Sequence, residues 1–460
     1  MNISTVKVKS VIYFLLFSIF TIVLPFTLIS GSNNTDFIPY FLFLVIALIA
    51  VLNISFNANT RGFSINIVHW IFVYIFLFLA PMFQFRYSDF PWNLSPTNGD
   101  IIAANLVIIL WSIIYMFARL IKSKDYKAKV ISNHSAKIHP ITIGISFLLS
   151  TIIIIYALIR IGFINLLSRY SYTNSLFESG NSMLFLIFNT TIRSFAIFSF
   201  VLLLFYIKGK RQNVFRLFLL LISGFYVFLL YFPLGSGRFW LYMIYLGIFI
   251  LLFKKIKGRY TLFIVTLFGL VYILPIINIF RYSNFLDSNF SITFTDGMAE
   301  TFLSGDFDAY SMIVRTISFV SDNGITFGYQ LLGAIFFFIP RSIWSNKPIG
   351  SGAFIGEHLG LAFTNISSPI IAEAIINFGY IGVVLIAFIF SRLVLKLDRR
   401  YNYYSSNRSP IIINLLYPFI VGFTFLIMRG DLLSAFSNLI GFIIPAIILL
   451  IINLFLLKNI

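Results

Sequence analysis

Apolar residues fall into long unbroken runs along this chain, with polar residues confined to the segments between them. A helix of roughly 20 apolar residues is long enough to cross the hydrocarbon core of a bilayer. Twelve such runs occur, at residues 11–29, 38–54, 64–84, 101–121, 140–159, 183–207, 216–233, 239–253, 260–280, 371–391, 410–428 and 433–457. The pattern predicts an all-α polytopic membrane protein of about twelve transmembrane helices, forming one membrane domain over residues 1–460.

Two features of these runs carry additional information. Lys7 and Lys9 precede the first run, and no small-residue cleavage pattern follows it, which is typical of an uncleaved signal-anchor. The stretch 216–253 is interrupted by Pro233 and the sequence Gly235–Arg238. Such a break is tolerated at membrane depth only where protein or a water-filled cavity covers it.

Two polar segments are long enough to be more than connections. If the N-terminus is cytoplasmic, both segments, 160–182 and 281–370, lie on the outer side. A loop of some ninety residues is usually functional. Within it Leu331–Ile339 is apolar but too short to span, so we expect short amphipathic or re-entrant helices in this second loop.

Composition narrows the class of protein further. Hydrophobic residues make up 59% of the chain and charged residues only 10%, which excludes a soluble enzyme and a disordered chain. The absence of cysteine excludes disulfides, thiolate nucleophiles and thiolate metal sites. A net charge of +18 would favour a nucleic-acid partner in a soluble protein, but in a membrane protein it can record which loops stay in the cytoplasm.

The placement of the charges decides between those two interpretations. With a cytoplasmic N-terminus, 23 of the 33 lysines and arginines fall in cytoplasmic segments, where Asp125 and Asp398 are the only acids. This bias matches the positive-inside rule. We therefore expect both termini in the cytoplasm and no nucleic-acid partner.

The outer segments carry a different set of basic residues. They contain one lysine, Lys347, and eight arginines: Arg86, Arg160, Arg169, Arg238, Arg281, Arg315, Arg341 and Arg429. The guanidinium fork grips phosphate with two hydrogen bonds and stays charged in a low dielectric, so the set favours a diphosphate site. The alternative is that these side chains reach ordinary lipid headgroups or pair with outer acids.

Arg193 lies inside a predicted span. A buried charge in the membrane is costly, and it usually marks a functional site. The alternative is a structural pair with a neighbouring helix.

Asp306 and Asp308 form an Asp-x-Asp motif in the second loop. This spacing can hold a divalent metal, but two acids so placed are also common in polar loops, and we expect no metal site. Arg429 and Asp431 are spaced as a local ion pair at the end of a span.

Three residues are candidates for proton transfer. Glu373 begins a predicted span and can act as a general base or as an arginine partner. His358, beside Glu357, can hydrogen-bond a sugar or relay a proton, or it can be an ordinary loop histidine. The nucleophile motifs of proteases and lipases are absent from the sequence.

A block in residues 328–385 is the most specific motif in the chain. It reads Ile339-Pro340-Arg341-x-x-Trp344-x-x-Lys347-Pro348, followed by Gly350-x-Gly352. A glycine follows an arginine after ten intervening residues in both loops, from Arg169 to Gly180 and from Arg341 to Gly352. Together with the Gly235–Arg238 element and the topology, this block resembles the Wzy-type oligosaccharide repeat-unit polymerases, which build O-antigen and capsule.

The resemblance implies a reaction on the outer face of the bacterial cytoplasmic (inner) membrane. A growing glycan on polyprenyl diphosphate is transferred to a hydroxyl of the next lipid-linked repeat unit, without metal or cofactor. It also implies that the protein works with membrane lipids, a flippase and a chain-length regulator. The catalytic candidates are then Arg238, Arg281, Arg341, Glu373 and His358. The substrate-binding candidates are Arg169, Lys347, Arg315, Arg429, Glu357 and Arg193.

Two other functions remain open from the sequence. A ligase that transfers finished glycan to an acceptor such as lipid A core would share the long outer loop and the arginines. A flippase or transporter of lipid-linked oligosaccharide is the second alternative. Against it, the two halves of the chain show no internal similarity, and so long an outer loop is unusual for a rocking bundle.

Overall fold

The computed structural model describes residues 3–29, 36–56, 63–121, 138–167, 186–208, 213–253, 259–273, 298–361, 363–406 and 411–458. Within these ranges the chain is helical, and the only β-type pairing is an isolated bridge between Phe90 and Leu94. Eight helices in this part of the chain are long and apolar enough to cross a membrane. The predicted class, a polytopic helical membrane protein, is therefore confirmed.

Each of the twelve predicted runs contains a helix within the described residues, but four of these apolar helical stretches are shorter there than a span. They are the apolar part of α1 (Ile3–Ile29), α11 (Val214–Leu230), α12 (Arg238–Leu252) and α13 (Arg259–Phe268), which continues into η5 (Gly269–Ile273). The count of twelve crossings therefore stays a prediction.

The N-terminal helices form one bundle together with α19 (Ile370–Ser406). It contains α1, α2 (Phe37–Phe56), α5 (Asn98–Leu120), α19 and a central helix made of α3 (Ile65–Tyr74), η1 (Ile75–Leu79) and α4 (Ala80–Tyr87). Most of the central helix is apolar on all its faces, and its most apolar stretch is entirely buried. A helix that is hydrophobic all round belongs in the middle of a bundle.

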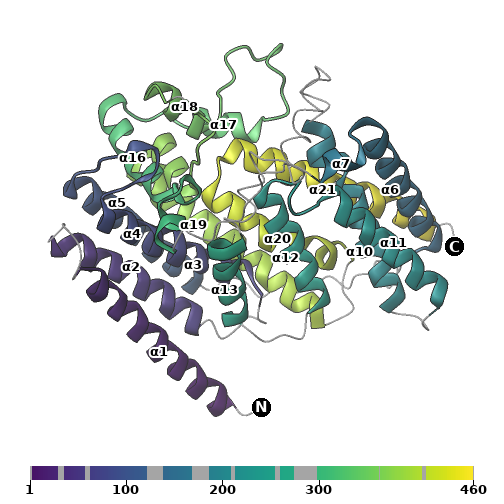
Figure 1. Ribbon diagram of the computed structural model, residues 1–460, viewed down its shortest axis with the longest axis horizontal. Coiled ribbons are helices and arrows are strands. Elements are labelled where there is room, and N and C mark those ends of the chain that lie inside the picture. Colours follow the sequence, from purple (N-terminus) through teal and green to yellow (C-terminus); the bar gives the residue numbers. More distant parts are fainter. Residues whose placement is uncertain are drawn as a thin grey trace.

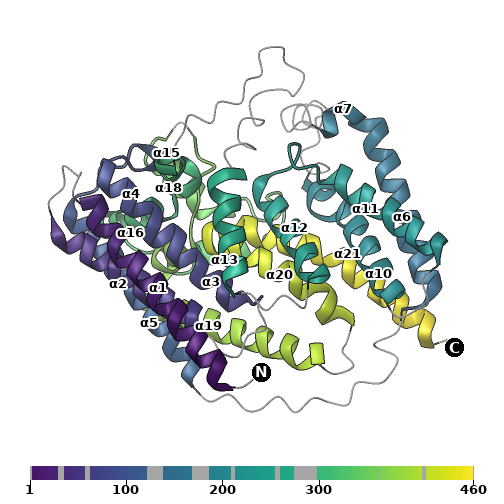
Figure 2. The same ribbon diagram turned by 60° about the horizontal axis from the view of Figure 1, so that its bottom comes forward.

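A second bundle lies beside the first (Figure 1; Figure 2). It contains α6 (Pro140–Arg160), α10 (Ser194–Lys208), α11, α12 and α21 (Leu432–Lys458), which enclose a separate apolar core. Between the two bundles runs α20 (Ile411–Arg429), which packs against α12 and α21 on one side and against α3 and α19 on the other.

Small residues let α12 and α20 approach closely. A Cβ atom at Gly422 would lie 2.6 Å from the Cα atom of Met243, and one at Gly247 would lie 2.3 Å from the ring of Phe419. Glycine is common at such contacts because lipid gives helices no hydrophobic reason to associate, so close packing has to supply the attraction.

At one end of the helices, side chains satisfy helix termini of neighbouring elements. The Asp398 carboxylate accepts hydrogen bonds from the amides of Ile65 (3.2 Å) and Asn66 (3.4 Å), the first residues of α3. Arg392 donates to the carbonyls of Ala118 (3.1 Å) and Ile121 (2.7 Å) at the end of α5. The sequence assigns all these segments to the cytoplasmic side, so they were predicted to lie together.

At the other end lies the described part of the predicted 281–370 loop. It folds into the short elements α15 (Met298–Leu303), η6 (Gly305–Phe307), α16 (Ala309–Asn323), α17 (Tyr329–Ile335) and α18 (Ser351–His358). The helix α16 packs against α5 and α19, while α17 packs against α19 and α21. The apolar segment Leu331–Ile339 begins in α17 and ends in turns.

The predicted break in the second bundle is present and covered by protein. α11 ends at Leu230 and α12 begins at Arg238. A Cβ atom at Gly235 would lie 2.2 Å from the carbonyl oxygen of Leu166, which ends the short helix α7 (Phe163–Leu166). Only glycine lets these two backbones approach so closely, so the Gly235–Arg238 motif is explained by packing as well as by the arginine at its end.

Candidate functional site

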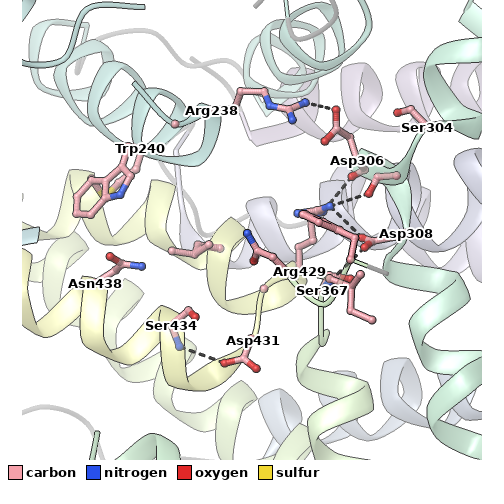
Figure 3. A pocket seen from close by; sticks show the side chains of 18 of the residues that line it. Arg238, Trp240, Ser304, Asp306, Asp308, Ser367, Arg429, Asp431, Ser434 and Asn438 are labelled. Carbon is pink, nitrogen blue, oxygen red and sulfur yellow. Dashed lines mark hydrogen bonds and ion pairs between the residues drawn. The ribbon is translucent and has the colours of Figure 1, made fainter. Parts of the chain in front are cut away.

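A cavity of about 410 Å³ lies where the two bundles meet. Its walls come from the α4–α5 turn, the start of α12, the loop elements around η6, the segment before α19, and the α20–α21 turn. Every one of these segments belongs to the end of the helices that the charge pattern assigns to the outside. The polar lining residues include Trp92, Arg238, Ser304, Asp306, Asp308, Asn365, Ser367, Arg429, Asp431, Ser434 and Asn438 (Figure 3).

Arg238 occupies one wall. It is the first residue of α12, directly after the covered break, and its guanidinium forms an ion pair with the Asp306 carboxylate of η6. The two side chains are only 10% and 17% exposed. The pair connects the start of α12 in one bundle to the loop elements above the other.

Arg429, the last residue of α20, makes a denser set of contacts. Its guanidinium donates to the Asp308 carboxylate (2.9 Å) and to the backbone carbonyls of Asp306 (2.9 Å) and Gly305 (3.1 Å). Asp308 is buried, and it also accepts hydrogen bonds from the Trp92 indole (3.0 Å) and the Ser367 amide (3.2 Å). Arg429 therefore anchors the η6 segment to the end of α20.

These contacts show how the acids considered in the sequence analysis are paired. Asp306 and Asp308 each face an arginine, and the described part of the chain brings no three acids or histidines together as a metal-binding group. The predicted local pair between Arg429 and Asp431 is not formed, because the guanidinium turns to Asp308 instead. The Asp-x-Asp motif is an arginine-pairing motif in this fold.

The balance of charge around the cavity limits what it can bind. Two arginines and three aspartates line it. A diphosphate can enter favourably only if an arginine exchanges a carboxylate partner for a phosphate oxygen. Of the two ion pairs, Arg238–Asp306 is the more exposed, because the Asp306 side chain is 17% exposed and that of Asp308 only 1%. Exchanging a carboxylate for a phosphate oxygen therefore costs less at Arg238 than at Arg429.

Asp431 lines the cavity beside these pairs, and Glu373 lies behind it. The Asp431 carboxylate accepts hydrogen bonds from the amides of Gly352 (3.3 Å) and Ser434 (3.1 Å). Burial raises the pKa of Asp431, although its backbone hydrogen bonds act in the opposite direction. Glu373 is 1% exposed and accepts from the Ser351 hydroxyl (2.8 Å) and the Leu432 amide (3.3 Å).

Glu373 was predicted to be a general base or an arginine partner. Its hydrogen bonds go to a hydroxyl and an amide rather than to an arginine, and it is not among the cavity-lining residues. Asp431, which lines the cavity, was considered in the sequence only as a local partner for Arg429.

Aromatic rings form part of the walls. Trp92 stacks on Phe363, with ring centroids 5.5 Å apart, and Trp240 lies on another wall. Behind Trp240, the buried guanidinium of Arg193 faces the rings of Tyr231 (4.4 Å) and Trp240 (5.1 Å). Its Nε donates to the Asn189 carbonyl (2.7 Å).

These contacts give Arg193 and Arg315 supporting positions rather than direct access. Arg193 donates to the Asn189 carbonyl of its own helix and to the Leu230 carbonyl at the end of α11, and it faces the Trp240 ring of the cavity wall. Arg315, on α16, donates to the backbone carbonyl of Trp92, which has a positive φ of 64°. Burial lowers the pKa of Arg315. Both arginines hold a tryptophan of the cavity wall.

Four other predicted site residues do not line the cavity. Arg341 is exposed and donates to the Lys347 carbonyl (2.7 Å), while the Lys347 ammonium donates to the Ile339 carbonyl (3.0 Å). Burial, followed by the charge of Arg341, lowers the pKa of Lys347. Glu357 and His358 are exposed at the end of α18, where His358 lies 3.4 Å from the Asn323 amide nitrogen. Arg169 and Arg281 lie outside the described residues.

The residues that sequence reasoning missed share one property: they meet only through the fold. Trp92 and Asp308 are hydrogen-bonded although 216 positions separate them. No local sequence motif marks Trp92, Trp240 or Asn438, or the role of Asp431 as a hydrogen-bond acceptor. The available signal was their position, because each lies in an outer segment or near the outer end of a predicted run.

Comparisons of the chain with protein-family models, with curated proteins and with solved structures found no match. The family resemblance of the sequence therefore remains a hypothesis about function, carried by the motif residues alone.

Proposed function

We propose that this protein is a glycosyltransferase that polymerises lipid-linked oligosaccharide repeat units on the outer face of the bacterial cytoplasmic membrane. The observation that carries the proposal is the cavity, where two arginines, three aspartates, amide and hydroxyl groups and two tryptophans meet at the predicted outer end of the helices. Polar side chains with flat apolar rings suit sugars, and arginines suit the phosphates that anchor them.

Arg238 supplies the main catalytic requirement of such a reaction. When the bond to the anomeric carbon breaks, negative charge develops on the departing polyprenyl diphosphate. Fixed cationic donors in a partly dry cavity stabilise that charge with little reorganisation. In this proposal a phosphate oxygen replaces the Asp306 carboxylate on Arg238, while Arg429 stays anchored to Asp308 and fixes the wall.

The rest of the lining suits the acceptor. Asn438, Ser434 and Asn365 offer neutral donors and acceptors for sugar hydroxyl groups, and Trp92 and Trp240 offer ring faces for the sugar. Arg193 and Arg315 then act as positioning residues, because each fixes one of these tryptophans. The apolar residues Met243, Phe423 and Leu426 continue the cavity wall along α12 and α20 and suit the first isoprene units of the carrier.

A deletion strain tests the proposal. Loss of the protein should leave a single repeat unit on the lipid carrier, detected by mass spectrometry of extracted lipids, and should abolish the polysaccharide ladder on gels. Complementation with Arg238→Ala or Arg429→Ala should fail, at protein levels matched by immunoblot. Finished polymer left on the lipid carrier would indicate a ligase instead, and repeat units trapped in the cytoplasmic leaflet would indicate a flippase. Either result overturns the proposed polymerase.

A further inference from the structure

Asp431 is unlike the other two aspartates of the cavity. Asp306 and Asp308 each form an ion pair with an arginine, whereas among the residues that the structure describes no arginine or lysine pairs with Asp431. Its oxygens accept from backbone amides of Gly352 and Ser434. A carboxylate held by amides, with one side toward an open cavity, keeps lone pairs available for a ligand proton.

We propose that Asp431 is the general base that takes the proton of the acceptor hydroxyl, with Glu373 as the buried group that positions it. This inference rests on the proposed polymerase function and assigns a catalytic residue to it. Asp431 is 8% exposed and lines the cavity, while Glu373 is 1% exposed and stands behind it.

The surrounding chain is shaped to hold Asp431 in place. A Cβ atom at Gly350 would lie 2.2 Å from the Asp431 carboxylate, and one at Gly352 would lie 2.4 Å from the Ile366 carbonyl. Both glycines of the Gly350-x-Gly352 motif are therefore required by close approach. Ser351, between them, donates its hydroxyl to Glu373 (2.8 Å). One three-residue segment thus contacts both carboxyl groups.

Glu373 also contacts the backbone directly after Asp431. Its second oxygen accepts from the Leu432 amide, the residue directly after Asp431. Two neighbouring carboxyl groups in a buried place do not both ionise readily. The other charged groups that line the cavity with Asp431 form two ion pairs, Arg429 with Asp308 and Arg238 with Asp306. Burial raises the pKa of Asp431, which makes its carboxylate a better proton acceptor than an exposed one.

The chemical step then balances without any further reactant. The acceptor hydroxyl oxygen forms a bond to the donor's anomeric carbon as the bond from that carbon to the diphosphate oxygen breaks. The electron pair leaves with polyprenyl diphosphate, whose charge Arg238 stabilises. The hydroxyl proton moves to an Asp431 carboxylate oxygen and passes from there to water.

The experiment compares Asp431→Asn and Asp431→Glu in the deletion strain, with Asp398→Asn as a matched control. Asp398 is a buried carboxyl on the same helix as Glu373, but it caps α3 far from the cavity. We expect Asp431→Asn to reduce polymer at least about 100-fold and Asp431→Glu to retain a measurable part. Asp398→Asn should keep polymer per folded molecule. Purified Asp431→Asn should still give the wild-type thermal shift with geranylgeranyl diphosphate as probe.

A pH profile adds a measurement that a purely structural role would not move. Polymer formation by spheroplasts of the wild type should fall as the external pH drops, because the base becomes protonated. Glu373→Gln should move the inflection to lower pH, since it removes a neighbouring acid.

Each outcome bears on one hypothesis or the other. Normal polymer from Asp431→Asn, while Arg238→Ala and Arg429→Ala make none, overturns the assignment of the base and leaves the polymerase intact. If Asp431→Asn does not fold, a wild-type profile that stays flat down to the pH at which the protein itself unfolds overturns it instead. A full ladder in the deletion strain itself overturns the proposed function.

Discussion

The two ends of α19 both bury carboxyl groups, and the comparison shows what separates a structural acid from a candidate catalytic one. At one end, Asp398 accepts from two α3 amides and from the Tyr417 hydroxyl (2.6 Å), and it is 2% exposed. At the other end, Glu373 and Asp431 also accept from amides, but Asp431 borders a cavity of about 410 Å³. Burial alone therefore does not mark a site, because both ends have it.

Arginines divide in the same way. Arg392, near Asp398, donates to carbonyls at the end of α5 and does not line the cavity. Arg238 and Arg429 instead meet acids on a cavity wall. A cationic side chain at a helix C-terminus satisfies orphan carbonyls and stabilises the fold, whereas one facing an acid across a cavity can exchange partners with a ligand.

The largest effect should come from Arg429→Ala. The substitution leaves Asp308 buried without its cation and releases the carbonyls of Gly305 and Asp306. Removing one partner of a buried pair costs about 3–5 kcal/mol, so thermal unfolding in detergent should shift strongly downward, and polymer should be lost. The double variant Arg429→Met with Asp308→Asn should recover part of the stability but no polymer. If Arg429→Ala unfolds like the wild type, the pair does not anchor the η6 segment.

Asp398→Ala should separate stability from activity at the opposite end. It removes the acceptor for two α3 amides and the Tyr417 hydroxyl, and leaving buried donors unsatisfied costs about 1–3 kcal/mol. We expect a clear loss of melting temperature with unchanged polymer per folded molecule, measured by size-exclusion fluorescence and glycan gels. A specific loss of polymer in well-folded Asp398→Ala would blur the distinction between the two ends.

Arg238→Ala should show the reverse of Asp398→Ala. The Arg238–Asp306 pair is less enclosed than the Arg429–Asp308 pair, so the substitution should destabilise the protein by only about 1 kcal/mol. Polymer should nevertheless fall sharply. Arg238→Lys is the informative companion, because it keeps the charge but loses the fork. Retained polymer in Arg238→Lys would mean that only charge is needed at this wall.

The sequence predicted the helices and their ends better than it predicted the site. Apolar runs are local, and the placement of lysines and arginines relative to them correctly grouped distant ends such as Asp398 with Ile65. The candidates Arg238 and Arg429 reached the cavity, but Arg341, Lys347, Glu357 and His358 did not line it. Their role was inferred from a motif, and a motif does not reveal which way a loop folds back.

The sequence could not predict which charged side chains pair with each other. Whether Asp306 and Asp308 meet a metal or an arginine depends on where α12 and α20 end in space, and no local pattern encodes that. The glycines of Gly350-x-Gly352 illustrate the same limit. Their purpose is clear only when Asp431 and the Ile366 carbonyl are seen to occupy the space of a side chain.

The smallest expected effect concerns how Asp431 contributes to stability with pH. Burial raises its pKa in the folded protein above the ordinary aspartate value of about 4. Between the unfolded and the folded pKa of Asp431, the folded protein therefore binds more protons than the unfolded chain. The contribution of Asp431 to the free energy of unfolding is full below about pH 4 and is lost as pH rises through the folded pKa. The melting temperature of the wild type should therefore decline slightly from pH 4 to pH 8 relative to that of Asp431→Asn. Both proteins should also carry Glu373→Gln, so that the acid next to Asp431 does not titrate. Every other ionisable group is the same in the two proteins, so its effect cancels in the difference between their melting temperatures. Parallel curves would mean that Asp431 ionises at no cost, as an exposed acid does, and the cavity end would then differ from the Asp398 end only in having space beside it.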